Sequence, residues 1–144
     1  MAKILIVDDT RLNAELLEAH LDGLGHDVAL ATNGEEALAL AAADPPDVVL
    51  LDIMMPKLSG FEVCRRLRAD PATVNVGILM VTALDQATDI ERAVEVGTDD
   101  FVTRPINKTE LLLRVNALLT AKSEPTATLR SLTYYRRVLA GIVA

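Results

Sequence analysis

Cysteine, aromatic residues and long apolar runs are all scarce in this chain of 144 residues. The single cysteine, Cys64, excludes an internal disulfide and is typical of a reducing compartment. Aromatic residues make up 3% of the sequence and hydrophobic residues 51%, so the core must be aliphatic. The longest apolar run, Ala37 to Ala43, is far shorter than the roughly 18 residues that predict a membrane span. We therefore expect a cytoplasmic protein that does not insert into a membrane.

Positive charge is also in deficit, because 14 lysines and arginines stand against 21 acids and leave a net charge of −7. This balance argues against direct binding of nucleic acid. The deficit ends near Ser123, after which the arginines outnumber the acids. The length allows one ordinary domain. We expect that domain over residues 1–121, followed by a basic amphipathic extension or linker over residues 122–144.

Short apolar runs alternate with helical patterns through the first 121 residues. Asn33 followed by Glu36, and Asn107 followed by Glu110, are typical of capped helix starts. Five strand-then-helix units in a row predict a parallel sheet with helices on both faces. The fold class is therefore α/β, with a doubly wound five-stranded parallel sheet and five helices. The predicted strands are Ile4–Val7, Val28–Ala31, Val48–Leu51, Ile78–Val81 and Phe101–Thr103.

Two further helical predictions depend on apolar spacing alone. Leucines recur from Leu12 to Leu24, and Gly25 is expected to end that helix. Beyond Pro125, apolar residues recur at helical spacing between arginines. We expect this tail to dock on its own domain, to pair with a second copy, to begin a linker to an output domain, or to fray. Its apolar positions are Leu129, Leu132, Tyr135, Val138, Leu139 and Ile142.

Polar residues follow four of the predicted strands, at the sheet edge where ligands of such folds bind. Carboxylates that meet there repel one another by about 4 kcal/mol per pair at about 4 Å. A hard divalent cation, Mg²⁺ or Mn²⁺, relieves that repulsion and prefers oxygen ligands. A carboxylate can also act as a nucleophile and form an acyl phosphate. The residues that supply these parts are Asp8, Asp9, Asp52, Thr82 and Arg104.

Four segments occur in an order and spacing typical of one family. They are ILIVDD at Ile4–Asp9, VVLLDIMMPKLSGFEV at Val48–Val63, VTA at Val81–Ala83 and DDFVTRPI at Asp99–Ile106. On these segments the chain resembles the receiver domain of two-component response regulators, with a flavodoxin-like fold, from about Ala2 to Ala121. The stretches FEVCRRLRADPAT and VTALD are also similar to the N-terminal receivers of diguanylate-cyclase response regulators, although the chain contains no cyclase domain.

The resemblance implies a role for each acid. Asp52 would be the phosphoacceptor and would attack a phosphohistidine on a histidine kinase or a histidine phosphotransferase. Asp9 would ligate Mg²⁺ directly, and Asp8 would help mostly through water. The backbone carbonyl of Met54 would complete the protein ligands of the metal.

The resemblance also assigns the residues around the acids. Thr82 would bond a phosphoryl oxygen, and Phe101 occupies the position of an aromatic residue that changes orientation on activation. Pro105 would follow a cis peptide bond. The family has lysine where this chain has Arg104, which is bulkier and planar. We expect phosphorylation to survive this change, with an altered rate or an altered coupling to Thr82.

The function predicted is that of a signalling module, not an enzyme: phosphorylation would switch the binding of a partner or the oligomeric state, with a homodimer as one form. The downstream protein or fused output domain is unknown. Met54 and Leu84 are apolar and cannot orient a water, so self-dephosphorylation is expected to be slow. An aspartate-dependent phosphohydrolase is disfavoured, because its two acids would be separated by one residue on the first strand. A degenerate receiver that binds partners without phosphorylation remains an alternative.

Overall fold

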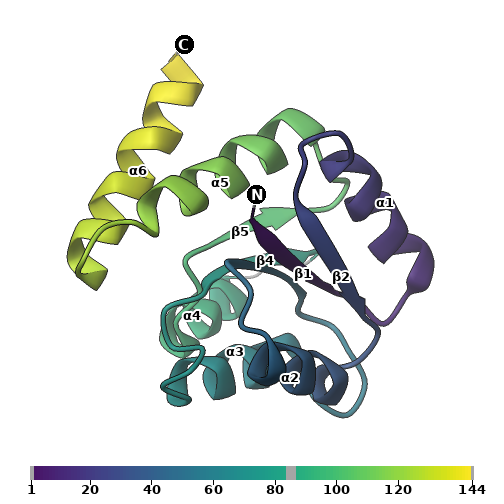
Figure 1. The fold of residues 1–144 in the computed structure, drawn as a ribbon. Coiled ribbons are helices and arrows are strands. Elements are labelled where there is room, and N and C mark those ends of the chain that lie inside the picture. Colours follow the sequence, from purple (N-terminus) through teal and green to yellow (C-terminus); the bar gives the residue numbers. More distant parts are fainter. Residues whose placement is uncertain (1, 84–86, 144) are drawn as a thin grey trace.

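The computed structural model describes residues 2–83 and 87–143, in which strands and helices alternate from β1 to α5 (Figure 1). A further helix, α6, follows at the carboxyl end. The strands are β1 (Lys3–Val7), β2 (Asp27–Ala31), β3 (Val48–Asp52), β4 (Gly77–Thr82) and β5 (Asp100–Thr103). The helices are α1 (Arg11–Leu21), α2 (Gly34–Ala43), α3 (Gly60–Ala69), α4 (Ala87–Val96), α5 (Lys108–Ala121) and α6 (Ala127–Val143).

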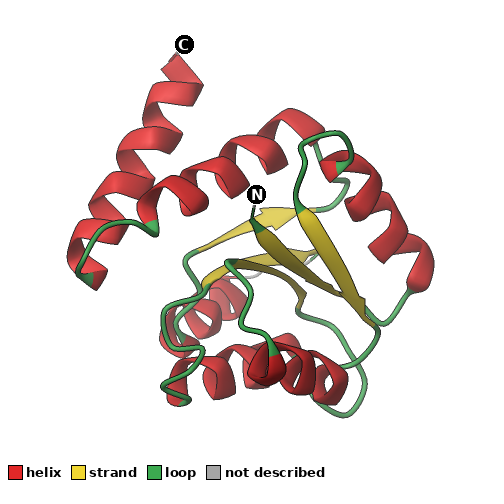
Figure 2. Ribbon diagram, in the orientation of Figure 1, coloured by secondary structure: helices red, strands yellow, loops and turns green. Residues whose placement is uncertain are grey.

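The five strands form one parallel sheet in the order β2-β1-β3-β4-β5. Helices α1 and α5 cover one face, and α2, α3 and α4 cover the other (Figures 1 and 2). The predicted doubly wound fold is therefore confirmed, and the predicted strands differ from the observed ones by only one residue at some ends. Among the described residues, no helix has both the length and the apolar character that crossing a bilayer requires.

The core is divided by the sheet into two clusters of aliphatic side chains. Successive residues of a strand point to opposite faces, so Ile4 and Ile6 belong to one cluster while Leu5 and Val7 belong to the other. The central strand β3 is buried along its whole length. Its sequence reads as an apolar run without alternation because both of its faces are covered.

The predicted helix caps are present. The side chain of Asn33 accepts a hydrogen bond from the Glu36 amide at 2.8 Å, and that of Asn107 accepts one from the Glu110 amide at 2.9 Å. Each bond satisfies an amide that has no partner within its helix.

The prediction for the first helix was wrong about its end. Helix α1 ends at Leu21, four residues before Gly25. Its buried face consists of Ala14, Leu17 and Leu21, whereas Leu12 is 64% exposed. Leucine spacing overestimated the length of the helix, because the chain turns at Gly23, which has a φ of +86°.

Helix α6 docks along α5, so docking on the same chain is the observed fate of the tail (Figure 1). The apolar positions predicted from spacing identify the docked face only in part. Val138 is buried, but so is Tyr134, which the spacing did not select. A Cβ at Gly141 would lie 2.3 Å from Leu113 of α5, which shows how closely the two helices approach. The other apolar positions of the tail are 41–66% exposed: Leu129, Leu132, Tyr135, Leu139 and Ile142.

A buried hydroxyl connects α6 to the sheet. The hydroxyl of Tyr134 donates to Asp100, at the start of β5, and the same carboxylate oxygen accepts a bond from Arg114 of α5. Burial and the Asp100 carboxylate both raise the pKa of Tyr134, so the hydroxyl remains a protonated donor.

Replacing Tyr134 with phenylalanine is expected to lower the free energy of unfolding by about 1–2 kcal/mol, because a bond to a charged acceptor is lost in a buried place. Urea denaturation followed by circular dichroism measures the change. Tyr135→Phe is the matched control, since that side chain is 53% exposed and its change should stay within about 0.5 kcal/mol. Equal losses in the two variants would show that the bond to Asp100 does not anchor α6.

Candidate functional site

The register of the sheet brings the carboxyl ends of β1 and β3 together. Val7 of β1 pairs with Leu51 of β3. In each case the next residue is an aspartate, so Asp8 and Asp52 lie side by side. Asp9 is the next residue after Asp8. One carboxylate oxygen from each of the three acids lies within 4.8 Å of the others. The sequence prediction that these acids meet at one edge of the sheet is therefore confirmed.

The acids differ in burial and in hydrogen bonding. Asp8 is fully buried, and Asp52 is 9% exposed. One oxygen of Asp8 accepts a bond from the Thr10 amide at 2.9 Å, and the other forms an ion pair with the Arg104 guanidinium at 2.5 Å. Asp52 accepts a bond from the Met54 amide at 3.3 Å. Asp9, by contrast, is exposed.

The site disfavours the ionised form of Asp52. Burial raises the pKa of this carboxyl from 3.8 to about 6, and the negative charge of Asp8 adds to the rise. The nearby Arg104 guanidinium lowers the pKa but does not cancel these effects. The nucleophile must be the ionised carboxylate. A cation added to the site would favour this form of Asp52.

The donor set fits a hard divalent cation. Asp8, Asp9 and Asp52 offer oxygen atoms only, at the spacing that one ion can bridge. Neither Cys64 nor a histidine belongs to this cluster, so the chemistry of the ligands favours Mg²⁺ or Mn²⁺ over zinc.

Thr82 and Phe101 lie on the two strands beyond β3. Thr82 ends β4, is 3% exposed, and accepts at its carbonyl a bond from the Arg104 amide at 2.8 Å. With Phe101 of β5 it lines a cavity of about 10 Å³, at the lower limit for holding one water. Ile90 and Ala93 of α4 complete much of this lining. The end of β4 and helix α4 therefore line the same small cavity.

Arg104 and Pro105 follow β5 directly. The peptide bond between them is cis, as the sequence resemblance implied. The Arg104 side chain is 23% exposed, and among the described residues its ion pair is with Asp8. The position of the cation at the acidic edge was predicted, but the choice of Asp8 as its partner was not.

Gly60 shapes the site, a role that was not predicted from the sequence. Helix α3 begins at this residue, directly over the end of β3, and the Gly60 amide donates to Ile53 at 2.9 Å. A Cβ placed here would lie 2.3 Å from the backbone oxygen of Asp52. Only glycine allows this close approach. The available signal was the position of the glycine, immediately after the helix cap Ser59.

Of the two residues predicted to make self-dephosphorylation slow, the structure describes Met54. The Met54 side chain is apolar, and it is 63% exposed. Leu84 lies outside the described residues.

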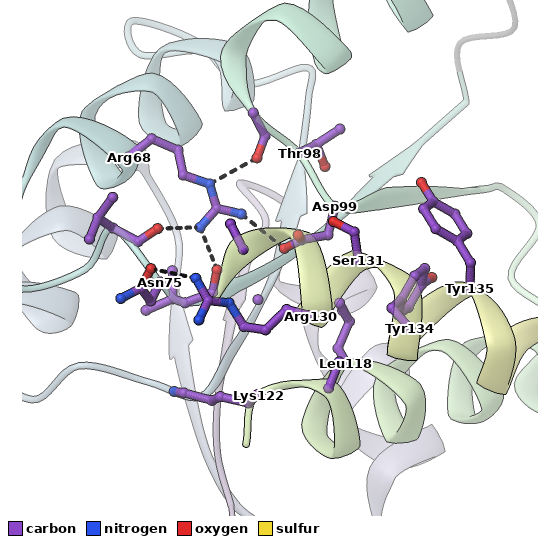
Figure 3. Close-up of a pocket in the computed structure, with 16 residues that line it drawn as sticks. Arg68, Asn75, Thr98, Asp99, Leu118, Lys122, Arg130, Ser131, Tyr134 and Tyr135 are labelled. Carbon is purple, nitrogen blue, oxygen red and sulfur yellow. Dashed lines mark hydrogen bonds and ion pairs between the residues drawn. The ribbon is translucent and has the colours of Figure 1, made fainter. Parts of the chain in front are cut away.

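A second hollow, of about 370 Å³, lies between α6 and the opposite end of the sheet (Figure 3). Its cationic side chains already have acceptors within the chain. Arg68 donates to the carbonyl of Gly97 at 2.8 Å and pairs with Asp99 at 2.9 Å, while Arg130 donates to the side chain of Asn75 at 2.9 Å. These bonds join α3, α6 and the loops that precede β4 and β5. The arginines of the hollow therefore connect parts of the fold.

Comparison with known proteins decides the family. The model of the response regulator receiver domain matches residues 4–116, which is most of the chain. This chain belongs to the response regulator receiver domain family. The predicted resemblance is thus confirmed, and the matched residues include all three acids as well as Thr82 and Arg104.

Individual receiver relatives differ in how much of their length they share with this chain. The response regulator PleD of Caulobacter vibrioides is 46% identical over 117 residues, which are 81% of this chain and 26% of PleD. Protein PilH of Pseudomonas aeruginosa is 43% identical over 119 residues, which are 83% of this chain and 98% of PilH. The chain therefore spans about a quarter of PleD but nearly all of PilH.

Solved receiver structures share the fold. The receiver domain of a signal transduction histidine kinase from Syntrophus aciditrophicus matches with a TM-score of 0.81 and 31% identity, over 88% of this chain and 96% of that one. Chemotaxis protein CheY4 of Vibrio cholerae matches with a TM-score of 0.78 over 83% of this chain. As a receiver, the chain belongs to the signalling modules of two-component systems.

Proposed function

We propose that this receiver accepts a phosphoryl group on Asp52, with a divalent metal ion held by the neighbouring acids, and that phosphorylation changes what the chain binds. The observation that carries the proposal is the meeting of three carboxylates, two of them buried, beside a cationic side chain at one edge of the sheet. Membership of the receiver family supports it.

The chemical step is the transfer of a phosphoryl group between two side chains. An oxygen of the Asp52 carboxylate attacks the phosphorus atom of a phosphohistidine on a kinase or phosphotransferase. The new P–O bond gives an acyl phosphate. The P–N bond breaks, and the imidazole nitrogen keeps the electron pair and then takes up a proton.

The residues around Asp52 hold the reacting groups. Asp9, Asp8 and the Met54 carbonyl would bind Mg²⁺, which supplies charge neutralisation for the phosphoryl oxygens. The Thr82 hydroxyl would donate to one phosphoryl oxygen, and Arg104 would provide the positive charge for which the family uses lysine.

The response to phosphorylation would pass from Thr82 to its neighbours. Thr82 shares its small cavity with Phe101 and with α4, so a new bond at Thr82 alters the packing of both. We propose that residues 1–121 form this switch in the cytoplasm and that residues 122–144 extend it toward an output protein or domain. A homodimer is one form in which that output would act.

A second candidate function is binding without phosphorylation. The Arg104 ion pair favours it, because an internal cation already neutralises Asp8. Both candidates use the same fold, and they differ only in whether Asp52 reacts.

Metal removal tests the proposal. With Mg²⁺ and acetyl phosphate, the chain should shift on a phosphate-affinity gel, and an excess of EDTA should reduce the shifted fraction to background. The reason is that Arg104 alone cannot offset the charge of three carboxylates and an incoming anion. An undiminished shift in EDTA would contradict the metal-dependent mechanism. A folded chain that never shifts would favour binding alone.

A further inference from the structure

Arg104 occupies a place in the acidic site that a metal ion also needs. Its guanidinium lies 2.5 Å from one oxygen of Asp8, and the other oxygen of Asp8 accepts the Thr10 amide. Both oxygens of this fully buried carboxylate are therefore engaged within the chain. A metal ion that uses Asp8, directly or through water, must therefore bind an oxygen that already accepts a bond from Arg104 or from the Thr10 amide.

Two cations close together at this edge also repel each other. The Arg104 side chain is 23% exposed, so solvent screens the charge of its guanidinium only in part. The positive charge that steadies Asp8 without metal is the same charge that opposes an incoming divalent ion.

We propose that Arg104 is an internal counter-ion that competes with the divalent cation for Asp8 and sets the metal affinity of this receiver. The inference rests on the proposed function, since it assumes that the three acids bind metal. Arg104 acts here as a positioning residue: it holds Asp8 in the metal-free chain and yields it when metal enters.

The side chain at position 104 determines how strongly this competition acts. A guanidinium presents five donors in a rigid fork and is weakly hydrated, which favours a lasting bond to carboxylate. A lysine ammonium has the same charge but is compact and strongly hydrated. Lysine should therefore release Asp8 more readily than arginine, and a neutral glutamine should not compete at all.

Direct metal titration tests this without any phosphodonor. Mn²⁺ would be added to the full chain, and the free ion followed by electron paramagnetic resonance, for the wild type, Arg104→Gln and Arg104→Lys. We expect Arg104→Gln to lower the Kd for Mn²⁺ about tenfold or more, because the variant removes both a like charge a few ångströms from the ion and a competing bond to Asp8. Arg104→Lys should fall between the two.

A charge-matched control separates local competition from net charge. Arg130→Gln removes the same charge at the opposite end of the sheet, where Arg130 bonds Asn75, and its Kd should stay within about twofold of the wild type. Equal Kd values for the wild type and both Arg104 variants would overturn the inference and leave the proposed function standing. No Mn²⁺ binding by any variant would overturn the metal site itself. If Arg104→Gln does not fold without metal, Arg104→Lys still decides the question.

Discussion

Replacing Asp52 with asparagine is expected to abolish phosphoryl incorporation from acetyl phosphate in the presence of Mg²⁺. The amide is nearly the same size as the carboxylate but is not a nucleophile, so no acyl phosphate can form. The incorporated fraction is measured on a phosphate-affinity gel beside the wild type. Incorporation at the wild-type level in Asp52→Asn would place the phosphoryl group elsewhere and contradict the assignment of Asp52.

The same variant should fold at least as well as the wild type, so loss of incorporation will not reflect unfolding. Burial raises the folded-state pKa of Asp52 from 3.8 to about 6, and a folded state that binds protons more tightly loses stability as pH rises through that window. Asparagine has no charge to bury. In metal-free buffer we therefore expect the Tm of Asp52→Asn to exceed that of the wild type at pH about 7, with a smaller difference at pH about 4. A constant difference across this range would contradict the pKa assignment.

Gly60→Ala is expected to destabilise the chain by about 3 kcal/mol or more, measured by urea denaturation. The added Cβ would lie 2.3 Å from the backbone carbonyl oxygen of Asp52 and 2.7 Å from the Cα atom of Ile53. Both neighbours are backbone atoms that cannot rotate away, so the start of α3 must move off the end of β3. Because Asp52 ends that strand, phosphoryl incorporation should fall as well.

Gly25→Ala is the control for the loss of a glycine as such. Gly25 has a φ of +77°, but a Cβ there would meet nothing within 4 Å. We expect a cost of about 1 kcal/mol from the left-handed backbone alone. A Gly60→Ala cost no greater than that of Gly25→Ala would show that the contact with β3 is relieved easily.

The fold was predictable because its signals are local. Apolar runs without alternation mark strands covered on both faces, and Asn33 and Asn107 mark the starts of helices through bonds to an amide three residues on. The meeting of Asp8 with Asp52 also followed from sequence, since parallel strands bring their carboxyl ends to one edge.

Other features depend on contacts that apolar spacing cannot specify. Tyr134 is buried, and its hydroxyl donates to Asp100, which also accepts a bond from Arg114. Leu139, one of the apolar positions predicted from spacing, is instead 60% exposed. The close approach at Gly60 and the pairing of Arg104 with Asp8 depend on the path of the backbone in three dimensions. Tertiary geometry therefore decided which face of α6 docks and which acid the arginine holds.

The most direct test of the account is intact-mass spectrometry of the wild-type chain after incubation with Mg²⁺ and acetyl phosphate, followed by peptide mapping after borohydride reduction of the acyl phosphate. The account predicts one phosphoryl group per chain, with the reduced residue at position 52. An unchanged mass in a folded chain, or a modification mapped to any other residue, would contradict it.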